Sequence, residues 1–515
     1  MRLSGSLSQF FWMRMRYVSD NAIYGNFLKR MAEIDIPYHE DPTFQSTVKR
    51  VEDALAWRVM GMLTNVSMLV TNAIGALTMI GILLKLDWWV LLAVLAPIII
   101  DYLINTHFGS DIWGIWMYKG DERKEADHAL DGFKHKEIVQ EAKIYGFGHY
   151  LAKKYNDANR SFIAAVVGKI NKKYFWLTGN SIISVGISLG IQVLLILKTI
   201  AGTITLQSYV FYVQSLQQIA GLFQTIQNNI SELYEYGLYV LDAKNLFELT
   251  DKIDKSKSTT LIEDAPPTIE FRDVSFSYPS SESPVIEHLS FTIRPGERIA
   301  LVGENGAGKS TIIKLLARFY DVTSGEILVN GVNIKEVNLS SYYKLWGVLF
   351  QYFARYWFTA RENIALGNLD FINDNERLKK AIEKGDAREL IDGLPKKENT
   401  MLSTDFPQGV DLSGGGWQKI GIARGMFAEP RLIVLDEPTS ALDALAEARV
   451  FEHIHTVAEG MTMLMVSHRF STVRKADRII VLEHGRIVEH GTHDELMTKN
   501  GLYHEMFETQ AEGYR

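Results

Sequence analysis

The chain has 515 residues, which is enough for two or three domains, and its net charge of −7 excludes the basic excess typical of nucleic-acid-binding proteins. It contains no cysteine, so disulfide bonds and thiolate metal sites are excluded. Hydrophobic residues make up 47% of the chain, and the mean hydropathy of −0.02 is an average over two halves of unlike character.

Apolar runs dominate the first half of the chain. The first run carries no charge, and a helix needs about 20 apolar residues to cross the hydrocarbon core of a bilayer. Short loops separate the first two runs and the last two, which predicts two tight membrane hairpins. The alternative, four buried helices of a soluble protein, is disfavoured because uncharged runs of this length are rare there. The runs cover residues 59–84, 88–100, 174–197 and 199–231.

Residues 107–173, between the hairpins, are polar and rich in lysine and arginine, whereas each short loop carries a single lysine. Because basic loops stay on the cytoplasmic side, this pattern places residues 107–173 and both chain ends in the cytoplasm. We therefore predict a multi-pass protein of the cytoplasmic membrane.

The fourth apolar run carries a stripe of amide and hydroxyl side chains at helical spacing. Such a stripe is costly in lipid, so it is expected to face protein or a water-filled cavity. A lining of a substrate path and a set of interhelical hydrogen bonds explain it equally well. Asp101, late in the second run, is a candidate functional carboxylate or a residue at the cytoplasmic interface. The stripe consists of Gln214, Gln217, Gln218, Gln224, Thr225 and Asn228.

The composition changes after residue 250, where a charged and polar stretch leads to Pro266 and Pro267, a pattern typical of a linker. A strand-like segment follows at residues 268–278. A second apolar strand then runs directly into a glycine-rich loop that begins at Gly303.

Residues 303–310 fit the pattern G-x-x-x-x-G-K-[ST] of a phosphate-binding loop. Its glycines let backbone N–H groups converge on phosphate oxygens, and the helix that follows adds its positive dipole end. Lys309 is expected to reach the outer phosphates of ATP, and Ser310 to ligate Mg²⁺. The predicted cofactor-binding residues of this segment are Gly303, Glu304, Asn305, Gly306, Ala307, Gly308, Lys309, Ser310 and Thr311.

An apolar strand at residues 431–435 ends in two acids, Asp436 and Glu437. Asp436 is positioned in the sequence to hold Mg²⁺, directly or through water, and Glu437 to polarise the attacking water. Taken alone, the segment could also be a capped strand that enters a helix at Pro438. The phosphate-binding loop makes the catalytic interpretation the stronger one.

The sequence Leu412-Ser-Gly-Gly-Gly-Trp-Gln-Lys419 stands before the acidic strand and precedes a helix-like stretch. With the motifs above, in the same order, it resembles the ABC transporter ATPases over about residues 268–510. The resemblance implies an ABC nucleotide-binding domain with a β-rich and a helical subdomain. We predict an α-helical transmembrane domain over residues 1–250, a linker over 251–267 and an α/β P-loop ATPase domain over 268–515.

The resemblance also implies roles for single residues. Tyr278 would stack on adenine, Gln351 would sense Mg²⁺ and contact the membrane domain, and residues 440–443 would cross a dimer interface. His468 would be the switch histidine at the γ-phosphate. Ser413 and Gly415 would bind ATP from the opposite subunit. The predicted catalytic residues are Glu437, His468, Gln351 and Lys309, and the predicted metal ligands are Ser310, Gln351 and Asp436.

Two features depart from the family pattern. Gly416 replaces the signature glutamine, which bears on ATP affinity and coupling but leaves Ser413 and Gly415 in place. Residues 404–411, before the signature, lack the acid-rich form common among exporters, which bears on signalling between domains.

The order of the parts, membrane region first and ATPase second, resembles the exporter arm of the family. Ile36-Pro-Tyr-His-Glu-Asp-Pro42 and Lys136-Glu-Ile-Val-Gln-Glu-Ala-Lys-Ile-Tyr-Gly146 resemble its first and second intracellular loops, which form coupling helices. The family's half-transporters have six membrane helices and four are counted here. The first two are therefore expected to be missing from this sequence, which is either truncated or a naturally short subunit.

We predict ATP-driven export of a lipid, peptide or drug-like substrate by a homodimer or heterodimer that uses ATP and Mg²⁺ and binds no nucleic acid. The alternative is a membrane-bound, ATP-binding regulatory or incomplete subunit that does not transport alone. The missing helices favour this alternative, whereas the intact Asp436, Glu437 and His468 argue against it.

Overall fold

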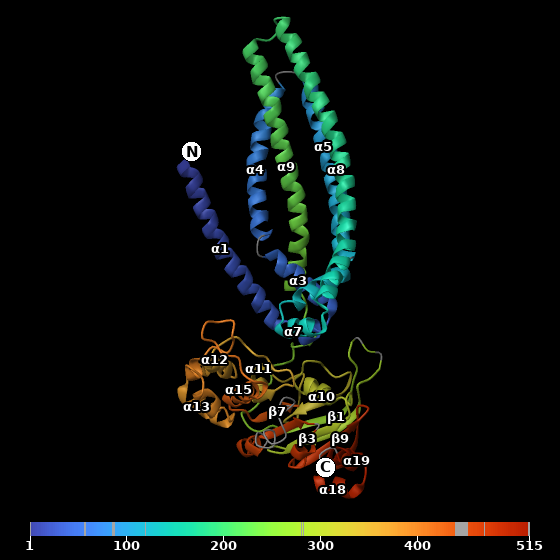
Figure 1. Ribbon diagram of the computed structural model, residues 1–515, viewed down its shortest axis with the longest axis vertical. Coiled ribbons are helices and arrows are strands. Elements are labelled where there is room, and N and C mark those ends of the chain that lie inside the picture. Colours follow the sequence, from blue (N-terminus) through green and yellow to red (C-terminus); the bar gives the residue numbers. More distant parts are fainter. Residues whose placement is uncertain are drawn as a thin grey trace. The chain divides into compact units, whose positions relative to one another are not determined.

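The computed structural model describes residues 2–55, 58–84, 88–118, 120–279, 281, 283–437, 452–467 and 469–512. The chain divides into two compact units, which are described one at a time (Figure 1). The first unit comprises Met1–Ile34 and Tyr38–Thr250, and the second comprises Asp35–Pro37 and Asp251–Arg515. The short segment Asp35–Pro37 therefore belongs with the second unit, although the chain on either side of it belongs with the first.

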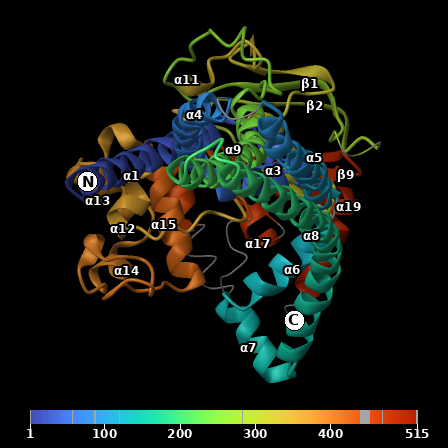
Figure 2. The same cartoon turned by 90° about the horizontal axis from the view of Figure 1, so that it is seen from above.

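Long helices build the first unit. They are α1 (Arg2–Glu33), α3 (Pro42–Leu55), α4 (Arg58–Leu83), α5 (Trp88–Tyr118), α6 (Gly120–Gly132), α7 (Lys136–Tyr145), α8 (Gly148–Ile200) and α9 (Leu206–Phe247). α4 packs along α9, and α5 packs along α8 and α9 (Figures 1 and 2). Buried Val90, Ile191, Leu195, Leu216 and Ile219 form the apolar cluster between α5, α8 and α9.

Three helices of the described residues are long and apolar enough to cross a membrane, and they contain the first three predicted runs except the last two residues of the first run. α8 has 53 residues, which gives a length of about 80 Å against a hydrocarbon core of about 30 Å. Its polar first half therefore extends beyond the membrane. The fourth predicted span lies in α9, which is not among the three because its amide stripe makes it less apolar.

The amide stripe of α9 points away from the packed helix interfaces of the chain. Gln224 and Asn228 line a cavity of about 630 Å³, whose wall also carries Asp101, Lys173 and Glu235. This placement favours the cavity-lining interpretation over hydrogen bonding between helices of one chain. The exposed members of the stripe are Gln214, Gln217, Gln218, Gln224 and Asn228, and Thr225 is half-buried.

Asp101 has a partner in the neighbouring helix. Asn180 of α8 donates from Nδ2 to Oδ1 of Asp101 at 2.8 Å and to the carbonyl oxygen of Pro97 at 2.7 Å. Asn180 is buried, with 5% of its surface exposed. The Asp101 carboxylate is therefore part of the α5–α8 packing as well as of the cavity wall.

Both segments predicted to form coupling helices are helical. The first contains α2 (Ile36–His39), and the second is α7. Gly146 ends α7 with a φ of +71°, a left-handed conformation that glycine adopts without strain. Their role in docking stays a prediction.

Two sheets form the centre of the second unit. The six-stranded sheet has the order β10-β9-β3-β8-β7-β6, and the four-stranded antiparallel sheet has the order β2-β1-β4-β5. In the larger sheet all strands run parallel except β10. The strands are β1 (Ile269–Phe276), β2 (Ile286–Ile293), β3 (Arg298–Gly303), β4 (Ser324–Val329), β5 (Val332–Asn333), β6 (Trp346–Leu349), β7 (Leu432–Asp436), β8 (Thr462–Val466), β9 (Arg478–Glu483) and β10 (Arg486–Gly491).

Helices cover both faces of the larger sheet. β3 shows this directly, because Ile299 and Leu301 join one apolar core while Ala300 and Val302 join another. Successive strand residues point to opposite faces, so a strand covered on both faces is apolar along its length. The described helices of the second unit, not all of which lie on this sheet, are α10 (Lys309–Leu316), α11 (Leu339–Tyr343), α12 (Ala360–Ala365), α13 (Asn375–Lys384), α14 (Arg388–Asp392), α15 (Gly414–Phe427), α17 (Phe470–Val473), α18 (His493–Lys499) and α19 (Leu502–Glu512), with 3₁₀ turns η1 (Leu369–Phe371) and η2 (Lys397–Asn399).

A third core lies among α12, α13, α14 and α15, around the buried Trp417 and Phe427. It corresponds to the helical subdomain that the resemblance implied, while the two sheets correspond to the β-rich part. The predicted fold class, a helical membrane region followed by an α/β ATPase unit, is confirmed.

We expect Asn180→Leu to lower the free energy of unfolding by about 2 kcal/mol, because the Asp101 carboxylate then loses its partner. The double variant Asp101→Leu/Asn180→Leu should recover most of this loss, since neither polar group remains at the interface. Thermal unfolding of the detergent-solubilised protein measures both. A single variant as stable as the parent would show that this hydrogen bond does not stabilise the helix pair.

Candidate functional site

The predicted phosphate-loop, metal and Glu437 residues gather at one edge of the six-stranded sheet. β3, β6, β7 and β8 run parallel, so their carboxyl ends meet there. β3 ends at Gly303 and enters the phosphate-binding loop, and β7 ends at Asp436. Gln351 follows the end of β6 by two residues. Motifs that lie far apart in the sequence are thus neighbours in space.

The loop between β3 and α10 requires glycine at two positions. Gly303 has a φ of +151°, and a Cβ atom there would lie 2.2 Å from the carbonyl oxygen of Leu482. Gly308 has a φ of +98°, and its Cβ would lie 2.6 Å from Cδ1 of Ile286. The glycines therefore allow a path that passes close to β9 and β2, and they leave the N-terminus of α10 open to an anion.

Two backbone carbonyl oxygens fix Lys309 inside this loop. Its Nζ donates to the carbonyl oxygens of Gly303 and Glu304, each at 2.8 Å, and only 6% of the residue is exposed. Burial lowers the pKa of Lys309, and the nearby Glu437 and Asp436 carboxylates oppose that shift. The loop thus holds a positioned cation at its centre.

Ser310 and Asp436 form an oxygen-rich pair beside the lysine. The Ser310 hydroxyl donates to Oδ1 of Asp436 at 3.3 Å. Burial raises the pKa of Asp436, while the hydrogen bond from Ser310 lowers it and the Glu437 charge raises it further. A hydroxyl and a carboxylate are oxygen donors of the kind that Mg²⁺ prefers, so the pair fits that ion.

Glu437 is held from two sides. Its carboxylate accepts a hydrogen bond from Nε2 of Gln351 at 2.9 Å, and its backbone N–H donates to the carbonyl oxygen of Val466 at 3.0 Å. Its φ of +47° is an uncommon conformation for a residue with a side chain. Such strain concentrates at functional sites, where the surrounding contacts maintain it. The Gln351–Glu437 contact was not predicted from the sequence.

Tyr278 lies near the phosphate-loop helix and within an aromatic group. Its hydroxyl is 3.1 Å from the Thr311 hydroxyl, and its ring packs edge-on against Phe276 and Tyr320. The Lys314 ammonium lies 5.3 Å from the centre of the Tyr278 ring. The ring is half-buried, so one part of it remains available for stacking.

The signature segment begins α15, away from the phosphate-binding loop and in the helical part of the unit (Figure 1). Ser413 is the N-cap of α15 and accepts a hydrogen bond from the N–H of Gly416 at 3.2 Å. A Cβ at Gly416 would lie 3.2 Å from Cβ of Leu412, so the family's glutamine would require a local shift. Asp411 accepts a hydrogen bond from Nε1 of Trp417 at 3.0 Å, a contact that sequence reasoning missed.

His468 and residues 440–443 lie outside the described residues. Of the predicted residues that the structure describes, Lys309, Ser310, Gln351, Asp436 and Glu437 lie together. Ser413 and Gly415 are on a separate helix of the same unit.

The sequence matches the protein family described as ABC transporter over residues 286–440. The chain is 31% identical over 489 residues to the subtilin transport ATP-binding protein SpaT of Bacillus subtilis, across 94% of this chain and 78% of that protein. It is also 31% identical to an ATP-dependent lipid A-core flippase of Methylobacillus flagellatus, across 88% of this chain and 76% of that protein. A bacterial Atm1-family ABC exporter with ATP bound shares the fold, with a TM-score of 0.84 and 24% identity over 99% of this chain and 88% of that chain.

We expect Gly303→Ala to weaken ATP binding by about tenfold or more, because the new Cβ would collide with the backbone of Leu482. Gly331→Ala is the matched control, since Gly331 has a φ of +79° with open space around its Cβ position. It should cost about 1 kcal/mol of stability and leave ATP affinity unchanged. Titration with a fluorescent ATP analogue separates the two effects. Equal affinities for the two variants would contradict the close-approach argument.

Proposed function

The chain belongs to the ABC transporter family as a membrane-bound exporter subunit that hydrolyses ATP, and from this premise we propose that the carboxyl edge of its six-stranded sheet is the hydrolytic site. The observation that carries the proposal is the placement of five residues at this edge, where Lys309 is held by backbone carbonyls, Ser310 bonds to Asp436 and Gln351 bonds to Glu437. We further propose that residues 1–250 form the membrane domain, 251–267 the linker and 268–515 the ATPase domain.

The loop of residues 303–311 binds the phosphates of ATP. Its backbone N–H groups and the N-terminus of α10 face the anion, and the Lys309 ammonium reaches the outer phosphates. Tyr278 stacks on the adenine ring, an assignment supported by its half-exposed position next to Thr311. The residues proposed to bind ATP on this chain are Tyr278, Gly303, Glu304, Asn305, Gly306, Ala307, Gly308, Lys309, Ser310 and Thr311.

Glu437 orients the water that attacks the γ-phosphate. Gln351 holds its carboxylate from one side, which supports a fixed direction for the acceptor. Lys309 and His468 stabilise the negative charge that develops on the transferred phosphoryl group. Positioning and electrostatics of this kind supply most of the rate in phosphoryl transfer.

Ser310, Gln351 and Asp436 are proposed to hold Mg²⁺. The ion would neutralise charge shared between the β- and γ-phosphates of bound ATP. Because burial raises the pKa of Asp436, protons compete with the ion for this carboxylate at a higher pH than for an ordinary aspartate.

A second ABC subunit completes the site, and we propose that it is another copy of this chain. One chain carries both the phosphate-binding loop and the signature, so two copies in a head-to-tail arrangement supply two complete sites. Ser413 and Gly415 of one copy would then contact the γ-phosphate held by the other. Their position on a separate helix of the unit agrees with a role across a dimer interface.

The polar cavity of the first unit is proposed to be part of the substrate path. It has amide groups from the stripe and charged groups of both signs on its wall, including Asp101, Lys173 and Glu235. Relatives are named for transport of subtilin and of a lipid A core. An amphipathic peptide-like or lipid-like substrate with a charged head suits such a wall.

We expect Glu437→Gln to lower ATP hydrolysis by about 100-fold or more while ATP binding is kept, because only the water-orienting carboxylate is lost. The measurement is Mg²⁺-dependent phosphate release by the protein in lipid vesicles. Glu483→Gln, which removes an exposed carboxylate at the same edge of the sheet, is the control and should hydrolyse ATP like the parent. Parent-like turnover in Glu437→Gln would overturn the assignment.

We expect Ser413→Ala to abolish most ATP turnover, because it removes a γ-phosphate ligand from the opposite subunit. It also removes a helix N-cap, worth about 1 kcal/mol. Thr359→Ala is the matched control, since Thr359 caps α12 in the same helical part through the N–H of Glu362. Both variants should lose similar stability, but only Ser413→Ala should lose turnover. Equal turnover in the two would mean that Ser413 acts only as a cap.

A further inference from the structure

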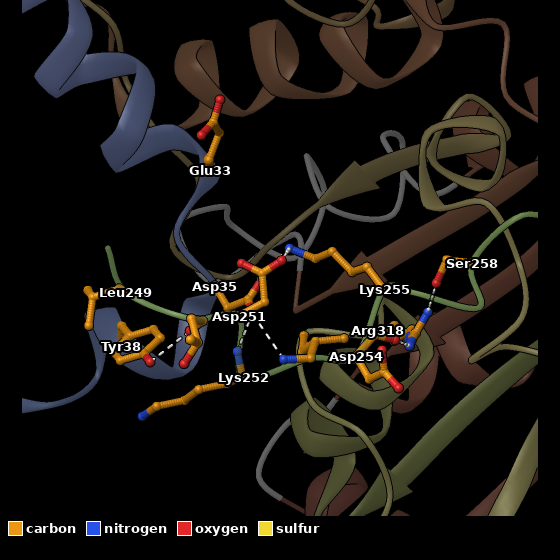
Figure 3. Close-up of polar contacts among 12 residues, drawn as sticks. Glu33, Asp35, Tyr38, Leu249, Asp251, Lys252, Asp254, Lys255, Ser258 and Arg318 are labelled. Atoms are coloured by element: carbon orange, nitrogen blue, oxygen red, sulfur yellow. Dashed lines mark hydrogen bonds and ion pairs between the residues drawn. The ribbon is translucent and has the colours of Figure 1, made fainter. Parts of the chain in front are cut away.

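A buried carboxylate holds the start of the predicted linker. Asp35 lies between α1 and α2, and 5% of its side chain is exposed. Its Oδ2 accepts hydrogen bonds from the backbone N–H groups of Lys252 at 2.8 Å and Ile253 at 3.1 Å (Figure 3). Its Oδ1 accepts from the Lys255 ammonium at 2.7 Å. Both oxygens of the carboxylate are therefore used, and all three donors come from one short segment.

The acceptor in these hydrogen bonds is a carboxylate, which makes them stronger than hydrogen bonds between neutral groups. Hydrogen bonds to an ionised acceptor are about twice as strong as neutral ones, and a buried backbone N–H needs a partner. Ile253 is itself buried, with 4% of its surface exposed. A linker that merely joined two units would need no fixed conformation, and ordering its residues costs conformational entropy. These contacts therefore indicate that residues 252–255 need one fixed conformation for their role in the protein.

The same segment is fixed again toward the phosphate-binding loop. Arg318, just after α10, has a fully buried side chain. It donates to the carbonyl oxygen of Asp254 at 2.7 Å and to the Ser258 hydroxyl at 2.6 Å (Figure 3). α10 begins at Lys309, so residues 252–258 are attached to Asp35 at one end and to the phosphate-loop helix at the other.

Within the first unit, the neighbouring residues of the two chain segments are also bonded to each other. The Arg30 guanidinium donates to the carbonyl oxygen of Leu249, and the Tyr38 hydroxyl donates to that of Thr250 at 2.9 Å. Residues in or just after α1 therefore bond to the chain after α9 at Leu249 and Thr250, before the Thr250–Asp251 peptide bond, and at Lys252, after it.

We propose that Asp35 is a positioning residue for transport. Its hydrogen bonds with Lys252, Ile253 and Lys255, together called the clasp, hold the start of the linker so that a displacement of α10 on ATP binding reaches α1 and α9 together. The path runs from the phosphate-binding loop through α10, Arg318 and residues 252–258 to Asp35. This inference rests on the proposed function, since it assigns a route to the coupling that an ATP-driven exporter requires.

Asp35→Asn tests the clasp with almost no change of volume. The amide oxygen of the new side chain can accept from Lys252 and Ile253, but its NH₂ group then faces the Lys255 ammonium, donor against donor. Lys255→Met in the same chain removes that conflict, so the double variant should be rescued. Lys257→Gln is the control for Lys255→Met. It removes the same positive charge from an exposed position two residues further along the linker.

Two measurements report on the ATPase unit and on the membrane unit separately. The chain contains no cysteine, so Gln224→Cys gives a single labelling site at the cavity of the first unit. Each variant is made in this background and reconstituted in lipid vesicles. Trapping with ATP, Mg²⁺ and orthovanadate measures the closed ATPase site, and the maleimide labelling rate of the introduced cysteine measures the membrane response.

For Asp35→Asn we expect trapped nucleotide within about twofold of the parent, with the nucleotide-induced change in labelling rate reduced about fivefold or more. Lys257→Gln should match the parent in both measurements, and Asp35→Asn/Lys255→Met should regain at least about half of the labelling change. An Asp35→Asn protein with the full labelling response would overturn the clasp. One that lost trapping as well would also overturn it, because Asp35 would then stabilise the ATPase unit itself. A parent that trapped no nucleotide would instead contradict the proposed function.

Discussion

The parallel pairing of β3, β8, β7 and β6 is the constraint on which the nucleotide site depends. Parallel strands present their carboxyl ends at a common edge, and here three of those ends carry different chemical groups. β3 delivers the phosphate-binding loop, β7 delivers two carboxylates and β6 delivers Gln351. A shift of β7 against β6 by one residue would turn its side chains to the opposite face and would break the contact of Gln351 with Glu437.

The same edge shows how the chain compensates buried charge. Lys309 is held by two carbonyl oxygens, and Asp436 by a hydroxyl group, so neither ion is buried without polar partners. Burial still disfavours both charged forms, which is why the pKa of the lysine falls and that of the aspartate rises. An anionic nucleotide with its cation would supply the missing charges to both groups. The site is thus arranged around a ligand that carries charge of both signs.

The sequence was informative where the signal was local. The glycine pattern at residues 303–310 and the acids after an apolar strand predicted the loop and the metal carboxylate, and the apolar runs predicted the long helices. Contacts across the fold could not be predicted, because Gln351 and Glu437 meet only through the pairing of β6 with β7. Asp35 left no signal at all. It is a single acid whose partners include two backbone N–H groups more than 200 residues away, and backbone donors leave no mark in a sequence.

Because α9 is one continuous helix, a motion of the linker at its C-terminal end can reach the cavity residues near its middle. This helix runs unbroken from Leu206 to Phe247, so the cavity residues Gln224 and Asn228 and the last turn belong to one rigid element. A flexible linker from residue 250 to 268 could span about 60 Å when extended, which is far more than the displacement of any packed helix. Such a linker would absorb motion instead of transmitting it. Because Asp35 holds the backbone N–H groups of residues 252 and 253, only the four residues 248–251 separate the last turn of α9 from this fixed backbone, a length of at most about 14 Å.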